Sequence, residues 1–337
     1  MRILVTGHTG FKGAWLSLML KSRGHEVLGI SLEPEANSLY MKAGISRALT
    51  EDINLDIRHL EELKAEVLRL KPEFVIHMAA QSLVRRSYGN PLETFTTNVN
   101  GTLNVLSACQ QLSHLNGILV ITTDKVYANV GKSIGYIESD PLGGSDPYSA
   151  SKAMADIATQ SWIASFKNSP IAIARAGNVI GGGDVCADRL VPDLIHSYSS
   201  GLTPKLRAPN SVRPWQHVLD CLNGYLILVE AMIQNRADGA WNFGPNERQS
   251  KTVADVANIA GAVWGVEKSW ERDLGDHPHE ASMLMLDSKK ARAELSWTDR
   301  LSFEESVEWT VNWHKNVYNG AEPLAEMKKN INDFESR

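Results

Sequence analysis

Short aliphatic runs alternate with longer segments of helical period through the first half of the chain. The runs are typical of buried strands, and the segments between them carry apolar residues at the spacing of amphipathic helices. We predict strands at Ile3–Thr6, Val27–Ser31, Phe74–His77, Ile118–Thr122 and Ile171–Arg175. The helices predicted between them are Trp15–Arg23, Leu60–Leu70, Glu93–Leu112 and Ser149–Phe166. This alternation predicts an α/β fold with a doubly wound parallel sheet.

The texture of the chain changes after Arg175. Gly181–Gly183 and a series of prolines ending at Pro214 break the sequence into short pieces before a helix predicted at Leu219–Met232. Periodicity is weaker in the last third, where helices are predicted at Val253–Val263, Lys289–Leu295 and Phe303–Trp313. The polar segment from Glu322 onward is expected to fray. We therefore expect a smaller, interrupted second α/β domain.

The composition excludes several classes of protein. The 337 residues are 43% hydrophobic and 22% charged, which is near the average of globular proteins and enough for one large or two ordinary domains. The 34 Lys and Arg residues against 39 Asp and Glu residues give a net charge of -5, without a block of like charges. Since backbone phosphates require a basic surface, we expect no nucleic-acid partner.

The sequence also bears on the compartment. Cys109, Cys186 and Cys221 are odd in number and widely spaced, which indicates reduced thiols in a reducing compartment. The first strand leads from Met1 directly into a glycine-rich turn, without the regions of a signal peptide, and no apolar run of about 18 residues occurs. We expect a cytoplasmic protein with no membrane partner.

A glycine-rich segment follows the first predicted strand and opens the first predicted helix. Its spacing is GxxGxxG rather than GxGxxG, and this context lets backbone N–H groups and the helix N-terminus approach a pyrophosphate. We therefore predict a dinucleotide site. The residues of this segment expected to contact the cofactor are Gly7, Thr9, Gly10, Phe11, Lys12 and Gly13.

The end of the second strand bears on the choice of cofactor. Ser31 occupies the position where an acidic residue would bind the ribose, and Glu33 lies just beyond it. No Arg or Lys between Ile30 and Glu35 is present to bind a 2′-phosphate, so NAD is favoured over NADP. Asp56 and Ile57 either contact the adenine or, in the alternative, Asp56 caps the following helix.

Tyr148 and Lys152 lie one helical turn apart, at i and i+4. A phenol with an ordinary pKa of about 10 becomes a usable base when nearby positive charge lowers its pKa. Thr123 follows a predicted strand at its carboxyl end, where ligands of open α/β sheets bind, and offers a hydroxyl partner. Thr123, Tyr148 and Lys152 are therefore candidate catalytic residues.

These motifs resemble those of extended short-chain dehydrogenases/reductases of the nucleotide-sugar-modifying branch. The shared motifs are Gly7–Gly13, Ala79-Ala80-Gln81, Asn98 with Gly101-Thr102, Thr123, and the pair Tyr148/Lys152. Four segments resemble, within that family, the 4,6-dehydratases that act on CDP-glucose. They are His8–Leu16, Thr123–Tyr127, Arg175–Asp184 and Arg213–Leu219. The resemblance covers residues 1 to about 320.

The resemblance implies a Rossmann-like domain of residues 1–176 with about 212–240, and a substrate-binding domain of 177–211 and 241–325, followed by a polar tail at 326–337. It implies NAD as cofactor, CDP-glucose as substrate, and a homodimer or higher homo-oligomer. Cofactor contacts outside the glycine-rich segment are then Ser31, Asp56, Ile57, Ala79, Ala80, Gln81, Asn98, Tyr148 and Lys152. Substrate contacts are Gln81, Asn178, Arg189 and Arg213.

The resemblance also implies roles in a reaction. Tyr148 would take the proton of the C4 hydroxyl, with Thr123 bonded to that oxygen and Lys152 holding the nicotinamide ribose while lowering the pKa of Tyr148. Asp124 would then protonate the departing C6 hydroxyl. Relatives that act on dTDP-glucose have Glu where this chain has Lys125, which is either the neutral base for the C5 proton or a charged stabiliser of the enolate.

Arg213 and Arg189 are natural partners for a diphosphate, because guanidinium binds phosphate with two hydrogen bonds. The alternative for Arg189 is that it only pairs with a neighbouring carboxylate on a surface turn. Trp215 either lines the substrate site or belongs to the core. The segment from His277 to Glu280 contains two His and one Glu, but no third ligand cluster accompanies it, so we expect no metal.

Two other functions use parts of the same pattern. A nucleotide-sugar 4-epimerase would share Thr123, Tyr148, Lys152 and NAD but needs no acid for a leaving hydroxyl, so Asp124-Lys125 disfavours it. A cofactor-sensing regulatory protein would be expected to have lost the Tyr148/Lys152 pair.

Overall fold

Seven parallel strands form the central sheet of the computed structural model, which describes residues 1–132, 134–166, 169–246, 251–275 and 284–337. The strands lie in the order β11-β6-β5-β4-β1-β2-β3. They are β1 (Arg2–Thr6), β2 (Glu26–Ser31), β3 (Glu51–Asn54), β4 (Phe74–His77), β5 (Ile118–Thr123), β6 (Ile171–Ala176) and β11 (Gly239–Phe243). The strand order reverses between β1 and β4, which confirms the doubly wound sheet and predicts a ligand crevice at its carboxyl edge.

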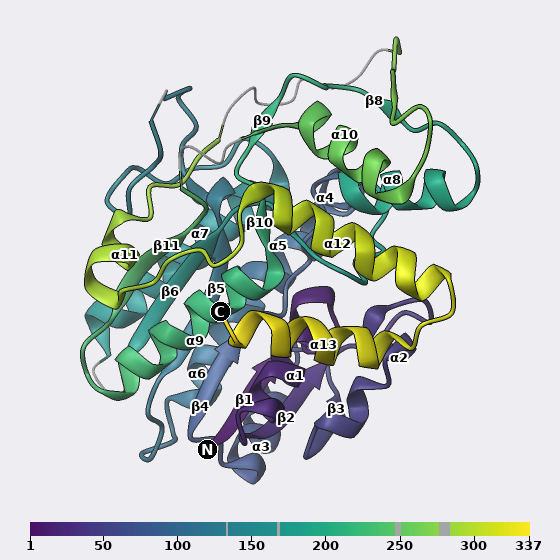
Figure 1. The fold of residues 1–337 in the computed structure, drawn as a ribbon. Coiled ribbons are helices and arrows are strands. Elements are labelled where there is room, and N and C mark those ends of the chain that lie inside the picture. The colour runs from purple at the N-terminus through teal and green to yellow at the C-terminus, as the bar shows by residue number, and fades with distance from the viewer. Residues whose placement is uncertain (133, 167–168, 247–250, 276–283) are drawn as a thin grey trace.

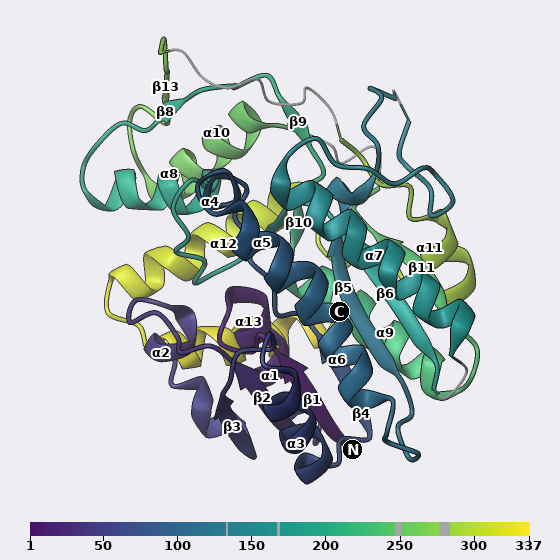
Figure 2. The ribbon, with the colours of Figure 1, turned by 180° about the vertical axis from the view of Figure 1, so that it is seen from behind.

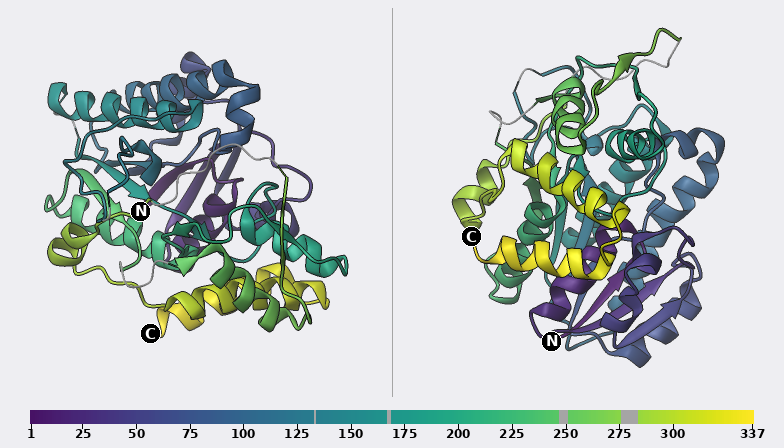
Figure 3. Two further views of the ribbon diagram at one scale, coloured as in Figure 1. Left: turned by 90° about the horizontal axis from the view of Figure 1, so that it is seen from above. Right: turned by 45° about the vertical axis from the view of Figure 1, so that its right-hand side comes forward.

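Helices cover both faces of this sheet, as Figures 1 and 2 show from opposite sides. One core contains Ile3 and Val5 of β1 with α1 and α9, and the other contains Leu4 with α3 and α6, because successive strand residues point to opposite faces. Seen from above, the strands lie between these two layers of helices (Figure 3). The helices of the two layers are α1 (Phe11–Ser22), α9 (Val218–Ile233), α11 (Lys289–Leu295), α3 (Leu60–Leu70), α6 (Gly101–Cys109) and α7 (Pro147–Ser165).

Two strands and one interruption differ from the sequence prediction. The edge strands β3 and β11 were not predicted, because β3 alternates only between half-buried and exposed residues and β11 is a short run that begins with Gly239. The helix predicted at Glu93–Leu112 is broken into α5 (Pro91–Phe95), a π-helical turn at Thr96–Asn100, and α6. Such turns are frequent at functional sites.

A smaller region with its own core lies above the carboxyl ends of the strands (Figure 1). Its helices are α8 (Leu190–Ser199), α10 (Val253–Trp264) and α12 (Phe303–Tyr318). Its short strand pairs are β7 (Val179–Ile180) with β10 (Gln216–His217), β8 (Lys205–Leu206) with β13 (Glu271–Arg272), and β9 (Val212–Arg213) with β12 (Lys251–Thr252). The short connecting helices are α2 (Leu39–Lys42), α4 (Val84–Gly89) and the 3₁₀ turns at Ile45–Ala48 and Asp124–Val126. The assignment of residues to two domains stays a prediction.

The polar segment after Glu322 does not fray. We expected a loose tail at 326–337, but Pro323–Glu335 is a helix, α13, that packs against α1. Met327, Ile331 and Phe334 recur at helical spacing and are all buried in the main core. The many charged residues on the outer face hide this narrow apolar stripe in the sequence.

No helix in the described part of the chain is long and apolar enough to cross a membrane.

Candidate active site

The glycine-rich loop at the start of α1 has the shape of an anion cradle. Gly7 has φ +76°, and a Cβ there would lie 2.7 Å from the backbone of Ala79. A Cβ on Gly13 would lie 2.3 Å from the Gly7 carbonyl oxygen, so both positions require glycine. Gly10 caps α1 with no side-chain hydrogen bond, which leaves backbone N–H groups of the first turn for a ligand. These features fit a bound pyrophosphate.

The end of β2 lies beside this loop. The Thr9 and Ser31 hydroxyls are 2.7 Å apart, and Thr9 also donates to the Leu32 carbonyl oxygen over 3.2 Å. Glu33 is exposed and accepts a 2.8 Å hydrogen bond from the Asn54 side chain. The structure thus brings together the hydroxyls of Thr9 and Ser31 where the ribose of a dinucleotide is expected.

Asp56 and Ile57 are held within the protein. Asp56 accepts a 2.9 Å hydrogen bond from the backbone N–H of Arg58 and pairs with its guanidinium, which lowers the pKa of Asp56. The residue that caps α3 is His59, so the helix-cap alternative for Asp56 is wrong. Ile57 is buried in the core, and a Cβ on Gly101 would lie only 2.5 Å from its Cδ1.

Asn98 joins the loop after β4 to the helix α7. Its Oδ1 accepts from the Gln81 backbone N–H over 2.8 Å, and its Nδ2 donates to the Gln81 carbonyl oxygen and to Ser151 Oγ. Ser151 in turn donates to the Tyr148 carbonyl oxygen over 2.7 Å. The side-chain amide of Asn98 therefore connects the loop at Gln81 to the start of α7.

The Gln81 side chain is similarly occupied. Its Nε2 donates to Thr94 Oγ1 over 2.9 Å and to the Leu83 carbonyl oxygen, and its Oε1 accepts from the Leu83 backbone N–H over 2.7 Å. These bonds shape the loop that follows Ala79 and Ala80. A ligand would have to share groups of Gln81 that the chain already uses.

Tyr148 and Lys152 lie buried on one face of α7. Pro147 is the first residue of this helix, and Asp146 caps it by accepting a 2.9 Å hydrogen bond from the Ser149 backbone N–H. Lys152 Nζ donates to the Ile121 carbonyl oxygen of β5 over 2.8 Å. Since β5 ends at Thr123, this bond sets the catalytic helix against the strand that carries the hydroxyl partner.

Thr123, Tyr148 and Lys152 form one cluster. The Thr123 hydroxyl favours the ionised form of the Tyr148 phenol and so acts to lower its pKa. Burial raises the pKa of Tyr148 to about 12, against the opposing effects of Thr123 and the charge of Arg189. Burial, assisted by the charge of Lys12, lowers the pKa of Lys152 to about 8. The phenol is thus protonated at neutral pH in the protein alone, and further positive charge is required to make it a base.

Asp124 lies in the 3₁₀ turn directly after β5. The Thr123 hydroxyl donates to its Oδ1 over 2.9 Å, and its Oδ2 is buried, 3.2 Å from where a Cβ on Gly177 would stand. Burial raises the pKa of Asp124, although the positive charges of Lys125 and Arg213 oppose this shift. A carboxyl group with a raised pKa at this edge of the sheet is suited to act as a general acid.

The two arginines proposed for the diphosphate approach the cluster from different segments. Arg213 lies in β9, and its positive charge acts to lower the pKa of Asp124. Arg189 pairs with Asp184 over 2.8 Å, and its charge acts on Tyr148. Asp188 pairs with Arg85 over 2.7 Å, so the neighbouring carboxylate that pairs with Arg189 is Asp184.

Asn178 and Trp215 lie between the sheet and the smaller region. The Asn178 carbonyl oxygen accepts a 3.0 Å hydrogen bond from the Gln216 backbone N–H, which leaves its half-buried side chain at the carboxyl edge beyond β6. Trp215 is buried in the core of the smaller region and donates to the Lys251 carbonyl oxygen over 3.1 Å. Of the two roles considered for Trp215, the structure supports packing in the core.

Sequence reasoning missed a buried ion pair beneath the site. Asp156 lies one turn after Lys152 on α7, and its two oxygens accept from Arg175 Nε and Nη2 over 2.8 and 2.7 Å. Both side chains are fully buried, and Thr122 also donates to Asp156. The spacing of Asp156 from Lys152 was a visible signal, because a carboxylate on the buried face of a helix needs a partner.

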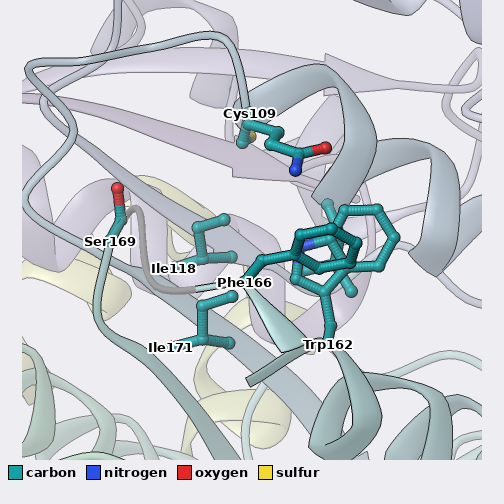
Figure 4. Close-up of a pocket in the computed structure, with 8 residues that line it drawn as sticks. Cys109, Ile118, Trp162, Phe166, Ser169 and Ile171 are labelled. Atoms are coloured by element: carbon teal, nitrogen blue, oxygen red, sulfur yellow. The ribbon is translucent and has the colours of Figure 1, made fainter. Parts of the chain in front are cut away.

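The remaining candidate sites offer less support for a function. The small cavity of Figure 4 holds about 20 Å³ and lies between Ile118 and Ile171, the first residues of β5 and β6, at the edge of the sheet opposite Tyr148. Within the described residues, no group of three His, Cys, Asp or Glu side chains is arranged to hold a metal. The segment from His277 to Glu280 lies outside the described residues.

Comparisons with known proteins agree with this geometry. The model of the NAD dependent epimerase/dehydratase family matches residues 3–244. The CDP-glucose 4,6-dehydratase of Salmonella typhimurium is 41% identical, over 99% of this chain and 96% of its own length. The dTDP-glucose 4,6-dehydratase of Haemophilus influenzae is 26% identical, over 93% of this chain and 98% of its own length.

Solved structures show the same likeness. The dTDP-glucose 4,6-dehydratase DesIV from Streptomyces venezuelae, solved with NAD and TYD bound, superposes with a TM-score of 0.82 at 25% identity, covering 96% of this chain and 100% of its own. The UDP-glucose 4-epimerase of Thermus thermophilus, solved with NAD, also superposes with a TM-score of 0.82 at 26% identity, covering 95% of this chain and 100% of its own.

Proposed function

This chain belongs to the NAD dependent epimerase/dehydratase family, and on that premise we propose that it converts CDP-glucose into CDP-4-keto-6-deoxyglucose by removing water, with NAD as a recycled cofactor. The observation that carries the proposal is the 41% identity to the Salmonella typhimurium enzyme over 99% of the chain. Asp124 Oδ2, buried and without a partner in the described part of the chain, supports a dehydratase over an epimerase, because only the dehydratase requires an acid for a leaving hydroxyl.

The chemistry dictates the order of the steps. The C5 hydrogen of a hexose becomes acidic only when C4 is a ketone, so oxidation at C4 comes first. Bound NAD would supply a reversible hydride acceptor for C4 oxidation and for the later reduction at C6, so no net NADH would form. Tyr148 would take the proton of the C4 hydroxyl, and Thr123, whose hydroxyl acts to lower the pKa of Tyr148, would hydrogen-bond that oxygen.

Elimination uses the two residues after Thr123. Asp124, whose pKa is raised by burial, would give a proton to the departing C6 hydroxyl. Lys125 serves the C5 proton step, as the base when it is neutral or as the positive charge beside the enolate oxygen when it is charged. The proton taken from C5 returns to C5 as the hydride adds to C6, and the proton that Tyr148 took from the C4 hydroxyl replaces the one that Asp124 gave up, which closes the cycle.

The residues that hold the cofactor follow from the loop geometry. The Gly7–Gly13 loop would bind the pyrophosphate with backbone N–H groups, and Thr9 and Ser31 would face the adenosine ribose. Lys152 would hold the nicotinamide ribose. Gln81 and Asn98, whose amides are used inside the chain, would act by shaping the loop at Ala79 and Ala80 rather than through their side chains.

The substrate diphosphate would lie between Arg213 and Arg189. Both positive charges act on catalytic groups, Arg213 on Asp124 and Arg189 on Tyr148, so a ligand between them would stand beside the reacting sugar. Asn178 would add a neutral donor. A planar guanidinium suits a diphosphate because it offers paired donors.

The proposal is tested by incubating the protein with CDP-, dTDP-, UDP- and GDP-glucose, with product masses and NADH absorbance recorded together. We expect only the CDP sugar to lose the mass of one water, without steady accumulation of NADH. A product of unchanged mass that has the C4 configuration inverted would indicate an epimerase. NAD binding without any turnover would indicate a regulatory protein.

We also propose a homodimer in the cytoplasm. Exposed apolar side chains on two adjacent helices support the dimer: Leu92 on α5 is 75% exposed, and Met154 and Ile157 on α7 are about half exposed. Burial of such a patch is a common basis for association of identical chains. Sedimentation of the wild type beside a Leu92→Glu, Ile157→Glu variant tests it, and a monomeric wild type would overturn it.

A further inference from the structure

The segment that carries Asp184 is fixed in place by the body of the protein. A Cβ on Gly182 would lie 2.2 Å from Trp313 Cγ, and Gly183 has φ +83°, so larger residues cannot occupy these positions. Trp15 Nε1 donates to the Gly182 carbonyl oxygen over 2.9 Å, and the Gly183 backbone N–H donates to His314 Nε2 over 3.2 Å. Asp184 therefore starts from a rigid backbone.

The Asp184 carboxylate is buried, and each of its oxygens accepts one hydrogen bond. Its side chain is 6% exposed, its Oδ2 accepts from Arg189 Nη1 over 2.8 Å, and its Oδ1 accepts from the Cys186 backbone N–H over 3.2 Å. Arg189 is 34% exposed and also donates to Ser82 Oγ over 3.3 Å. The carboxylate thus holds one edge of the guanidinium.

Arg189 lies within electrostatic range of Tyr148, the proposed base, since its positive charge acts to lower the pKa of the phenol. Asp188, the residue directly before it, does not share this role. Asp188 is about half exposed and pairs with Arg85 on α4. Two aspartates in one loop therefore differ in function: one orients Arg189, and the other makes an exposed ion pair.

We propose that Asp184 is a positioning residue that holds the Arg189 guanidinium in the orientation that binds the diphosphate of the substrate. This inference rests on the proposed function, in which Arg189 is a diphosphate ligand. A long side chain that is ordered before the ligand arrives loses less conformational entropy on binding, so the ion pair contributes affinity without touching the ligand.

A double-mutant cycle tests the proposal. Affinity for CDP is measured by calorimetry on the wild type, Asp184→Asn, Arg189→Ala and the combined variant. We expect Asp184→Asn to weaken CDP binding about tenfold, and to have no further effect once Arg189 is Ala, because the carboxylate acts only through that side chain. In turnover, Asp184→Asn should raise KM about tenfold and change kcat by less than about twofold.

Asp188→Asn is the matched control, with the same substitution four residues later in the loop. It should leave CDP affinity within about twofold of the wild type, because an exposed pair contributes little. Equal and additive losses from Asp184→Asn in both backgrounds would show a general loss of loop structure and overturn the proposal. Tighter CDP binding in Asp184→Asn would also overturn it, since the carboxylate would then compete with phosphate.

Failure of the proposed function is recorded separately. If the wild type leaves CDP-glucose unchanged but binds dTDP, UDP or GDP, the double-mutant cycle is measured with that diphosphate. The same results then support or overturn the role of Asp184. If the wild type binds none of the four nucleoside diphosphates, Arg189 has no diphosphate to bind and the inference is overturned together with the function. Binding of NAD by each variant shows that the fold is retained.

Discussion

The Thr123 hydroxyl donates a 2.9 Å hydrogen bond to Oδ1 of Asp124, while Oδ2 of the same carboxyl group is buried without a partner among the described residues. Thr123 thus influences both proposed ionisable groups, because it donates to the proposed acid Asp124 and acts to lower the pKa of the proposed base Tyr148. Oxidation and elimination would share this hydroxyl at the end of β5, although the two steps use different ionisable groups.

Elimination should be separable from oxidation at Asp124 and Lys125. The variant Asp124→Asn, Lys125→Ala keeps Thr123, Tyr148 and Lys152, so we expect it to oxidise CDP-glucose and to accumulate enzyme-bound NADH while the dehydrated product disappears. A single-turnover absorbance trace and a mass spectrum of the sugar nucleotide measure the two steps. Dehydrated product at the wild-type rate would contradict the assignment, and the absence of NADH would assign this pair to oxidation as well.

Tyr148→Phe should abolish the base while leaving the fold intact, because only a hydroxyl is lost from a buried ring. We expect kcat to fall at least about a hundredfold. NAD affinity and the thermal unfolding midpoint serve as controls and should stay near their wild-type values. Turnover at a normal rate would show that another group takes the C4 hydroxyl proton.

Arg213→Lys should weaken the binding of substrate more than it slows the chemistry. The substitution keeps the positive charge near Asp124 but removes the planar pair of donors. We expect KM to rise about tenfold with kcat nearly unchanged, and NAD affinity measured without nucleotide sugar to stay the same. A fall in NAD affinity alone would place Arg213 in the cofactor site.

Lys152 should make stability depend on pH in the alkaline range. Its pKa is lowered from 10.5 to about 8 in the fold, so between these values the unfolded chain binds a proton that the native state has released. The free energy of unfolding therefore rises with pH across this window. Below pH 8 both states are protonated, and the buried ammonium costs the native state roughly 3 kcal/mol.

Urea unfolding of Lys152→Met and wild type between pH 7 and 10 measures this effect. Because the variant lacks the titrating group, the wild type should gain roughly 2 kcal/mol relative to the variant as the pH rises from 8 to 10. All other groups titrate in both proteins and cancel in the difference. A difference that stays constant over this range would contradict the lowered pKa of Lys152.

Phe334→Ala tests the C-terminal helix. Phe334 is fully buried in the main core, and the Arg300 guanidinium lies 4.9 Å above its ring. Loss of the ring should lower the free energy of unfolding by about 3 kcal/mol in urea titrations. Lys329→Ala on the exposed face of the same helix is the control and should change stability by less than about 0.5 kcal/mol. Equal effects of the two substitutions would show that α13 contributes little to the core.

The sequence by itself determined five of the seven strands of the central sheet and the motifs from which the site is proposed. Buried parallel strands are continuous apolar runs, so β1, β2, β4, β5 and β6 were predicted to within a residue at each end. The glycine-rich loop and the Tyr148/Lys152 spacing are local features that act through neighbouring residues of one segment. For the same reason both were visible before any fold was known.

Only the tertiary structure decided what depends on distant partners. The buried face of α13, the interruption of α5 and α6 by a π-helical turn, and the pairing of Arg189 with Asp184 rather than Asp188 all depend on contacts between segments. The raised pKa of Asp124 is decided in the same way, since it follows from burial by residues that are remote in the chain. Burial and pairing are properties of the packed molecule, and a linear pattern carries them only where one segment supplies both partners.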